Sequence, residues 1–467
     1  MDFVQYIENK TFDEIQVGDT AELTRTLKRD DIELFAVMSG DVNPAHVDAK
    51  FAKSDMFHKV IAHGMWGGAL ISAVLGTELP GPGTIYLNQS FRFRKPVGIG
   101  DTVTVTVRVS EKRPEKKRVV LACACVNQAG ETVIEGEAEV IAPVEKVRRP
   151  RVVLPEVHLH EQGARYRDLI GATRNLSPIR TAVVHPVDAA SLGGALEAAA
   201  DGLIVPVLVG PMAKIKSVAA AGGFDIAALE CVDTAHSHAA AEVAVGLVRN
   251  GKADAIMKGA LHTDEIMSAV VQKETGLRTE RRISHVYALD VPHYPKPLFI
   301  TDAAINIAPG IDDLRDIVQN AIDLVQALGV SLPKVALLSA VETVSSNLPS
   351  TIAAAALCKM ADRGQITGGL VDGPLAFDNA ISKASAATKH IASQVAGDAD
   401  ILVVPSLEAG NMLAKQLIYL SGAEAAGLVL GARVPIMLTS RSDSQLARKA
   451  SAAIAQIYVH RRPDRKK

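Results

Sequence analysis

The pattern of hydrophobic and polar residues changes character after about 145 residues. Within the first part, residues 101–109 alternate polar and apolar side chains, and residues 118–126 and 132–141 are rich in β-branched residues. Such runs are typical of strands, and the short turns between them predict an antiparallel sheet. The charged stretch Glu111–Lys117 contains Pro114 and favours a solvated hairpin turn, with a phosphate-binding patch as the alternative.

Residues Gly64–Gly76 are apolar on every side of a helix, which predicts a buried helix. One buried helix followed by an antiparallel sheet indicates a sheet wrapped around that helix. Prolines and basic residues gather in 143–155, which favours an interdomain linker, with a basic anchor for nucleic acid as the alternative. We therefore expect a first domain over residues 1–145, a linker over 146–155 and a second domain over 156–467.

The second part of the chain alternates short apolar runs with helical patterns. The clearest helix is expected over 311–328, where apolar residues recur with helical spacing. Alternating strands and helices predict an α/β domain with a mainly parallel sheet. Because roughly 310 residues are many for one core, we expect two lobes around a cleft. The expected strands are Thr181–His185, Leu203–Val209, Ala255–Lys258, Leu298–Thr301, Val335–Ala340, Gly369–Asp372, Ile401–Pro405 and Pro435–Thr439.

Composition narrows the class of protein. The chain has 467 residues, with 50 Lys and Arg against 52 Asp and Glu, a balance that argues against a nucleic-acid partner. The first residues show no signal peptide, and the apolar runs are shorter than the ~20 residues of a membrane-spanning helix, so we expect a cytoplasmic protein. Cys123 and Cys125 lie two apart in an apolar run, which favours buried thiols over a redox or metal site.

The first cluster of chemically capable residues lies in FAVMSGDVNPAHVDAKFA, residues 35–52. Asp41 and His46 flank Pro44, which stops a helix and places the pair on a turn. A carboxylate and an imidazole presented together can activate one water molecule. Gly64 then opens the expected buried helix, whose free N–H groups can stabilise the enolate charge that develops on a thioester carbonyl.

The segment SGDVNPAH resembles the hydratase signature of the (R)-specific enoyl-CoA hydratases, which belong to the MaoC-like, hot-dog-fold family. The later HGM and FRFRKPVGIGDTVTVTVRV also resemble that family, and the resemblance covers roughly residues 10–142. Ala45 departs from the branched aliphatic residue usual before the histidine, which puts inferences about acyl-chain specificity in doubt.

This resemblance implies an α+β hot-dog domain with hydratase chemistry. Asp41 and His46 would activate water for syn addition across a 2-enoyl-CoA, and Gly64 would supply an oxyanion N–H. Asn43, inside the same signature, would contact the substrate. Because hot-dog domains usually dimerise, the resemblance also implies a homo-oligomer.

The second cluster consists of polar residues at expected strand ends, where α/β folds place their sites. An arginine there can bind phosphate or stabilise an oxyanion, and a nearby aspartate can act as a general base. Two residues have an ordinary structural alternative: Asp443 can cap the helix expected over 444–457, and Lys258 can begin a surface helix. The candidates of this cluster are Lys258, Asp302, Asn306, Asp372, Ser440, Arg441 and Asp443, and Asn379, Asn411 and Lys415 are further candidates for substrate binding.

The motifs IMKG, TDAAINIAP, LVDGPLAFDNAIS, PSLEAGNMLAKQL and VPIMLTSRSDS resemble the phosphate acetyl/butyryltransferase family, in order, over roughly residues 160–460. That resemblance implies two α/β lobes like those of isocitrate dehydrogenase, and acyl transfer between coenzyme A and inorganic phosphate without a metal. Ser440 and Arg441 would line the site near the thiol. In that family an aspartate would take the thiol proton. The family has a longer spacer between the arginine and this aspartate, so whether Asp443 is the equivalent residue stays open. LAFDNAISKASA is closer to the butyryl branch.

Together these observations predict a bifunctional enzyme that joins a hydratase to an acyltransferase. Its substrates would be coenzyme A thioesters, phosphate and acyl phosphate, with no covalently bound cofactor, no metal, no nucleic acid and no membrane. One alternative makes the first domain a non-catalytic acyl-CoA-binding and dimerising module. Another makes the second domain a nicotinamide-dependent dehydrogenase, although no GxGxxG follows an expected strand. The acyl length and the physiological direction stay open.

Overall fold

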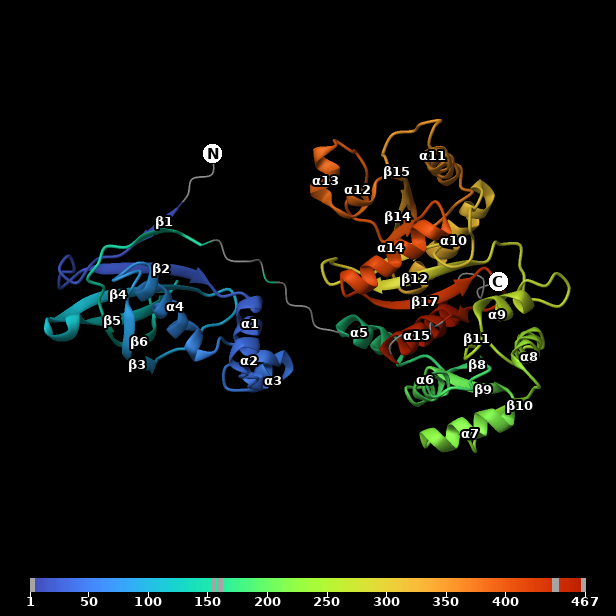
Figure 1. The fold of residues 1–467 in the computed structure, drawn as a ribbon, viewed down its shortest axis with the longest axis horizontal. Helices are drawn as coiled ribbons and strands as arrows, with labels where there is room; N and C mark the ends of the chain where they lie inside the picture. Colours follow the sequence, from blue (N-terminus) through green and yellow to red (C-terminus); the bar gives the residue numbers. More distant parts are fainter. Residues whose placement is uncertain (1–4, 153–156, 158–162, 439–444, 463–467) are drawn as a thin grey trace. The chain divides into compact units, whose positions relative to one another are not determined.

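The computed structural model describes residues 5–152, 157, 163–438 and 445–462. The chain divides into two compact units, residues 1–160 and 161–467 (Figure 1). Among the described residues, no helix combines the length and the hydrophobicity that crossing a lipid bilayer requires.

The first unit is a five-stranded antiparallel sheet with one long helix, α4, packed against it. The strands are ordered β2-β4-β5-β6-β3. Ile71 and Val74 of α4 share a buried core with Val105, Val107 and Leu121 of the sheet. This confirms the expected sheet wrapped around a helix. The elements are β1 (Tyr6–Glu8), β2 (Thr20–Thr26), α1 (Arg29–Ser39), α2 (Pro44–Val47), α3 (Ala49–Ser54), α4 (Gly64–Thr77), β3 (Ile85–Phe93), β4 (Thr102–Arg113), η1 (Glu115–Lys117), β5 (Arg118–Asn127), β6 (Thr132–Ile141) and β7 (Arg148–Pro150).

Three local predictions meet different outcomes in this unit. The turn expected over Glu111–Lys117 is confirmed only from Pro114 onward, because β4 continues to Arg113 and η1 leads directly into β5. Complete burial of the helix is wrong for the single chain, since Met65 and the other residues on its side of α4 are exposed. Within the expected linker, β7 pairs antiparallel with β1.

Cys123 and Cys125 are buried in β5, as expected. Burial raises the pKa of the Cys123 thiol to about 11 and that of Cys125 to about 12. Both thiols are therefore protonated at neutral pH, which agrees with a structural role.

The second unit is a single sheet of eleven strands, ordered β10-β9-β8-β11-β18-β17-β12-β13-β16-β14-β15, with helices on its faces (Figure 1). Helices α6 and α8 pack on the first group of strands, and α11 and α14 pack on the last group. The elements are α5 (Ala164–Thr173), β8 (Ile179–Val184), α6 (Ala189–Ala200), β9 (Ile204–Gly210), α7 (Met212–Gly222), β10 (Glu230–Asp233), α8 (Ser237–Arg249), β11 (Ala255–Lys258), α9 (Thr263–Val270), β12 (Ser284–Asp290), β13 (Leu298–Thr301), α10 (Ile311–Ala327), β14 (Lys334–Leu338), α11 (Pro349–Asp362), β15 (Leu370–Leu375), α12 (Phe377–Ile381), α13 (Lys383–Thr388), β16 (Ile401–Val403), α14 (Leu407–Leu420), β17 (Glu424–Leu430), β18 (Ile436–Met437) and α15 (Gln445–Arg461).

The sheet is mainly parallel, as expected, but its centre is not. β12 runs antiparallel to both of its neighbours, β13 and β17, and β17 also runs antiparallel to β18. The parallel strands on the two sides of this centre therefore run in opposite directions. β10, β12 and β17 were absent from the predicted strands. In β12 the sequence SHVYALD mixes polar and apolar residues, and β17 contains Ala-Ala-Gly, so neither carries a clear strand signal.

Candidate active sites

The loop after α1 carries the first candidate carboxylate. Gly40 ends the helix with a φ of 74°, a left-handed conformation that glycine adopts without steric cost. The chain then turns, and Asp41 Oδ1 accepts a hydrogen bond from the backbone N–H of Asn43 at 3.1 Å. Asn43 Oδ1 in turn accepts one from the N–H of Ala45, which caps α2. The Asn43 side chain thus holds the turn that presents Asp41 and His46.

Two imidazole rings lie next to this turn, and their hydrogen bonds fix which nitrogen carries a lone pair. His46 Nδ1 lies 2.9 Å from the carbonyl oxygen of Ile61, and His63 Nε2 lies 3.0 Å from the carbonyl oxygen of Asp41. Because a carbonyl only accepts, each of these nitrogens donates a proton. In the neutral rings the lone pairs therefore belong to His46 Nε2 and His63 Nδ1.

Asp41, His46 and His63 converge on one point. One ligand-capable atom from each of the three side chains lies within 4.8 Å of the others. The two rings are tilted by 37° with their centroids 4.1 Å apart. The structure thus brings the predicted Asp41–His46 pair together and adds His63, which the sequence placed at the helix entry without a role.

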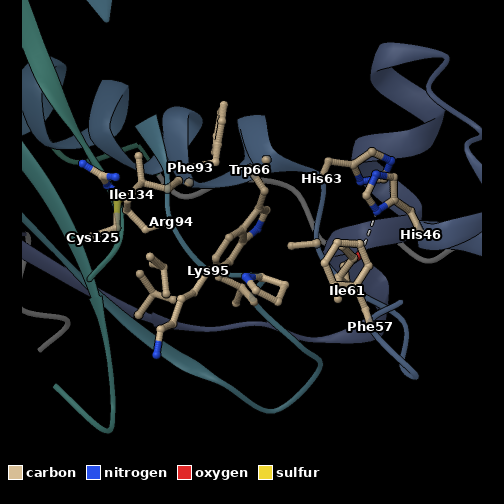
Figure 2. Close-up of a pocket in the computed structure, with 17 residues that line it drawn as sticks. His46, Phe57, Ile61, His63, Trp66, Phe93, Arg94, Lys95, Cys125 and Ile134 are labelled. Carbon is tan, nitrogen blue, oxygen red and sulfur yellow. Dashed lines mark hydrogen bonds between the residues drawn. The ribbon is translucent and has the colours of Figure 1, made fainter. Parts of the chain in front are cut away.

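Of these three residues, His46 and His63 line a cavity of ≈ 260 Å³ inside the first unit, shown in Figure 2. Trp66 crosses its centre, and Phe93, Cys125 and Ile134 line the apolar part. Arg94 and Lys95 also line it, paired with Glu135 and Glu131. The cavity therefore combines an apolar compartment with a polar end at His46 and His63.

Gly64 is the first residue of α4 and also lines the cavity. The first N–H groups of a helix have no partner within it, so this position offers hydrogen-bond donors. A Cβ on Gly64 would lie 2.9 Å from the ring of Phe93. Only glycine lets the helix start approach this ring so closely.

In the second unit, both carboxylate oxygens of Asp302 accept hydrogen bonds from the loop that follows it. Asp302 follows β13 and is 2% exposed. Its Oδ1 accepts hydrogen bonds from the N–H groups of Ala304 and Ile305, and its Oδ2 accepts from the backbone and side-chain amides of Asn306. Arg282 Nε donates to Asn306 Oδ1 at 2.7 Å. Asp302 and Asn306 therefore shape the loop that follows β13.

Other predicted residues lie around this loop or farther away. Asn411 in α14 donates to the carbonyl of Ala303 at 3.2 Å, which joins α14 to the loop. Lys415, also in α14, is exposed. Asn379 is buried in α12, and its amide lies 3.4 Å from Glu342 Oε2.

Two predictions about position need correction. Asp372 was expected at the end of a strand, but β15 continues to Leu375, so Asp372 lies inside it and pairs with Ala336. The surface position considered for Lys258 is wrong, because Lys258 is the buried last residue of β11.

Lys258 and Asp302 lie at the ends of β11 and β13, which are separated by three strands in the sheet and run in opposite directions. Met257, beside Lys258, pairs with Met437 of β18, which directly precedes the segment containing Ser440, Arg441 and Asp443. Those three residues lie outside the described residues. Four strand spacings of about 4.8 Å, roughly 19 Å in all, separate β11 from β13.

His285 in β12 is a residue that sequence reasoning missed. It is 1% exposed, and the pairing of Val286 with Thr301 places it beside Asp302. Burial lowers the pKa of His285 well below its ordinary value, and the Asp302 carboxylate opposes this only in part. The ring is therefore neutral at pH 7. A single histidine in SHVYALD gives no sequence signal for this position.

Comparison with known proteins agrees with the two units. Residues 237–456 match the family described as "Phosphate acetyl/butaryl transferase", and residues 13–127 match the "MaoC like domain". A phosphate acetyltransferase of Rhizobium meliloti is 61% identical over 301 residues, which cover 64% of this chain and 95% of that protein.

Two solved structures are also similar. A branched-chain phosphotransacylase from Enterococcus faecalis is 31% identical, with a TM-score of 0.54, over 61% of this chain and 99% of that one. An (R)-hydratase from Pseudomonas aeruginosa is 46% identical, with a TM-score of 0.33, over 33% of this chain and 100% of that one. The chain thus belongs to the phosphate acetyl/butyryltransferase family, and it joins the transferase unit of that family to an N-terminal MaoC-like domain.

Proposed function

We propose that the chain catalyses two reactions of coenzyme A thioesters in separate units. The first unit hydrates a short 2-enoyl-CoA to a 3-hydroxyacyl-CoA. The second exchanges an acyl group between coenzyme A and inorganic phosphate. Membership of the transferase family decides against the dehydrogenase alternative for the second unit.

The observation that carries the hydratase assignment is His46, which lines a cavity in a MaoC-like domain and has the carboxylate of Asp41 beside it. His46 Nε2 has the lone pair that accepts a proton from water, and the carboxylate of Asp41 stabilises the resulting imidazolium. The hydroxide adds to the β-carbon, while the N–H of Gly64 stabilises the developing enolate oxygen. The same pair then returns the proton to the α-carbon, which gives syn addition.

Cavity shape supports a short acyl chain. Trp66 is 6% exposed and crosses the cavity, and Ile134 and Cys125 close the apolar part behind it. The test is the loss of enoyl-thioester absorbance with 2-enoyl-CoAs of increasing length. The proposal predicts the highest kcat/KM for the shortest chains, and it fails if no chain length is hydrated.

For the transferase, we propose that Arg441 stabilises charge in the transition state and that Ser440 lines the same site. Lys258, Asp302, Asn306, Asp372, Asn379, Asn411 and Lys415 are proposed to bind or orient the substrates. The length of coenzyme A suits a site that draws on both lobes. Whether the preferred acyl group is acetyl or butyryl is decided by thiol release from a panel of acyl-CoAs with phosphate.

Arg441→Ala should lower acyl transfer by ~100-fold or more. Arg441→Lys should rescue only part of this, because the planar fork of the guanidinium is lost. Asp443→Asn separates two roles: a helix cap tolerates asparagine, whereas a general base does not. Turnover of Arg441→Ala at the wild-type rate would remove Arg441 from the mechanism.

We further propose that the protein is a cytoplasmic homo-oligomer, and that residues 1–145 and 156–467 are its functional domains, joined by a linker over 146–155. The first unit supports self-association because β3 is an edge strand with exposed Ile85 and Leu87, and Met65 of α4 is exposed. Unpaired edges and exposed apolar groups of this kind favour pairing with another chain. Molar mass in solution is the test.

A further inference from the structure

The cluster of Asp41, His46 and His63 has the composition of a metal site as well as that of a catalytic pair. Two imidazoles and one carboxylate that face the same point are a common ligand set for Zn²⁺ and related divalent ions. Within the described residues, this is the one group of three such side chains whose ligand atoms converge.

The hydrogen bonds of both rings leave the right atoms for a metal. Metal-bound histidines usually donate their second N–H to a carbonyl or carboxylate, which fixes the tautomer and the ring orientation. His46 does this with the carbonyl of Ile61, and His63 does it with the carbonyl of Asp41. Asp41 Oδ1 is held by the N–H of Asn43, which leaves Oδ2 as the third ligand atom.

An unsatisfied buried nitrogen is the second observation. His63 is 3% exposed, and its Nδ1 is buried without a hydrogen-bond partner among the described residues. A buried lone pair without a donor costs free energy unless something binds it. The hydration chemistry proposed for Asp41 and His46 does not use this atom, so it needs a separate account.

The distances are compatible with a bound ion after a small adjustment. Zn–N distances of about 2.0–2.1 Å in a tetrahedral site place ligand atoms about 3.3–3.5 Å apart. The three side chains already have ligand atoms within 4.8 Å. Asp41 is exposed and His46 is half-buried, so the cluster is open to solvent, through which an ion can enter.

We propose that Asp41, His46 and His63 bind a divalent zinc-like ion and that the bound ion inhibits hydration. The metal would occupy the lone pair of His46 Nε2 and one oxygen of Asp41, the two groups that would otherwise activate water. The binding part stands on geometry alone, and the inhibition part rests on the proposed hydratase function. Zn²⁺ would thus bind reversibly and switch hydration off, and it would take no part in the hydration reaction itself.

The test uses the full chain, stripped with a chelator and then desalted. Titration with Co²⁺, a spectroscopic substitute for Zn²⁺, should give ligand-field absorption that saturates with the cluster and is displaced by Zn²⁺. His63→Gln keeps an amide N–H for the carbonyl of Asp41 but lacks the second ring nitrogen. It should weaken Zn²⁺ binding at this site on the order of 100-fold. Asp41→Asn should weaken it as a second, independent variant.

His58→Gln is the matched control. His58 is an exposed histidine in the same unit, with its Nδ1 directed at the carbonyl of Lys53, and it lies outside the cluster. This variant should bind Zn²⁺ as the wild type does. The inference is overturned if His63→Gln and Asp41→Asn both retain the wild-type stoichiometry and spectrum.

Hydration is measured in the same samples. Zn²⁺ should suppress hydration by the metal-free wild type, a chelator should restore it, and acyl transfer should not change. Hydration that persists with the site occupied would refute the inhibition. A metal-free protein that binds Zn²⁺ but hydrates no enoyl-CoA would instead refute the proposed function and leave the metal site standing.

Discussion

Gly64→Ala should damage hydration through one steric contact at the start of α4. The added Cβ would lie 2.9 Å from Phe93 Cε1 and 3.2 Å from two further ring atoms. Restoring ordinary contact at 3.4 Å requires the helix start and the ring of Phe93 to separate by about 0.5 Å. The part of this shift that the helix start takes up moves the Gly64 N–H away from the thioester oxygen and weakens that hydrogen bond.

Loss of one oxyanion donor costs about 10²–10³ in rate, and a partial displacement should cost less. We expect kcat/KM for a short 2-enoyl-CoA to fall about 10- to 100-fold. Acyl transfer by the second unit should stay normal. The assay is the decrease in enoyl-thioester absorbance, measured beside thiol release with phosphate.

Gly76→Ala is the matched control on the same helix, because nothing lies within 4 Å of its added Cβ. It should leave hydration unchanged and stabilise the helix by roughly 0.5–1 kcal/mol. Equal hydration by Gly64→Ala and the wild type would refute both the steric argument and the role of Gly64 as a donor. Equal losses in the two variants would mean that the helix tolerates no alanine, independently of the substrate.

The remaining predictions concern stability. Asp302→Ala leaves three backbone N–H groups and the Asn306 amide without their acceptor, so denaturant unfolding of the second unit should show a loss of about 3–5 kcal/mol. A loss below about 1 kcal/mol would mean that water replaces the carboxylate.

For the first unit, burial raises the thiol pKa of Cys123 to about 11 and of Cys125 to about 12, from 9.0. The folded state therefore holds these protons more tightly, so this stabilisation is complete below pH 9 and is lost as the pH rises through about 11 to 12. Thermal unfolding should show the decline, and it should be smaller in Cys123→Ala/Cys125→Ala, where Tyr86, whose pKa is also raised to about 12, still contributes.

Sequence patterns predicted the elements with a strong periodic signal. The helix expected over 311–328 is α10, and the strand expected over 132–141 is β6, because each has an unbroken apolar pattern on one face. The change of strand direction across β17 and β12 could not be predicted, since an antiparallel strand in the centre of the sheet has no pattern that distinguishes it from its parallel neighbours. The prediction that α4 is buried on every side was wrong, because an apolar sequence does not require burial of the whole helix. One side of α4, which includes Met65, remains exposed on the single chain.

The sequence indicated the candidate site residues more readily than the contacts between them. The turn around Pro44 correctly predicted that Asp41 and His46 lie together. The stacking of His63 on His46 joins residues 17 apart through the fold, so spacing alone did not indicate it. The sequence indicated Asp302 as a candidate because it follows a strand. The same position explains why its carboxylate accepts hydrogen bonds from the loop that follows.

Asp41→Asn tests the central claim, that one chain carries two separate coenzyme A chemistries. Asparagine keeps the size of the side chain and removes the carboxylate charge that assists the imidazole. The measurement compares hydration of a short 2-enoyl-CoA with acyl exchange between acetyl-CoA and phosphate, in the wild type and in the variant. The account predicts that both reactions occur in the wild type, and that Asp41→Asn loses hydration on the order of 100-fold or more while acyl exchange stays within twofold. Absence of hydration in the wild type, or equal loss of both reactions in the variant, would contradict it.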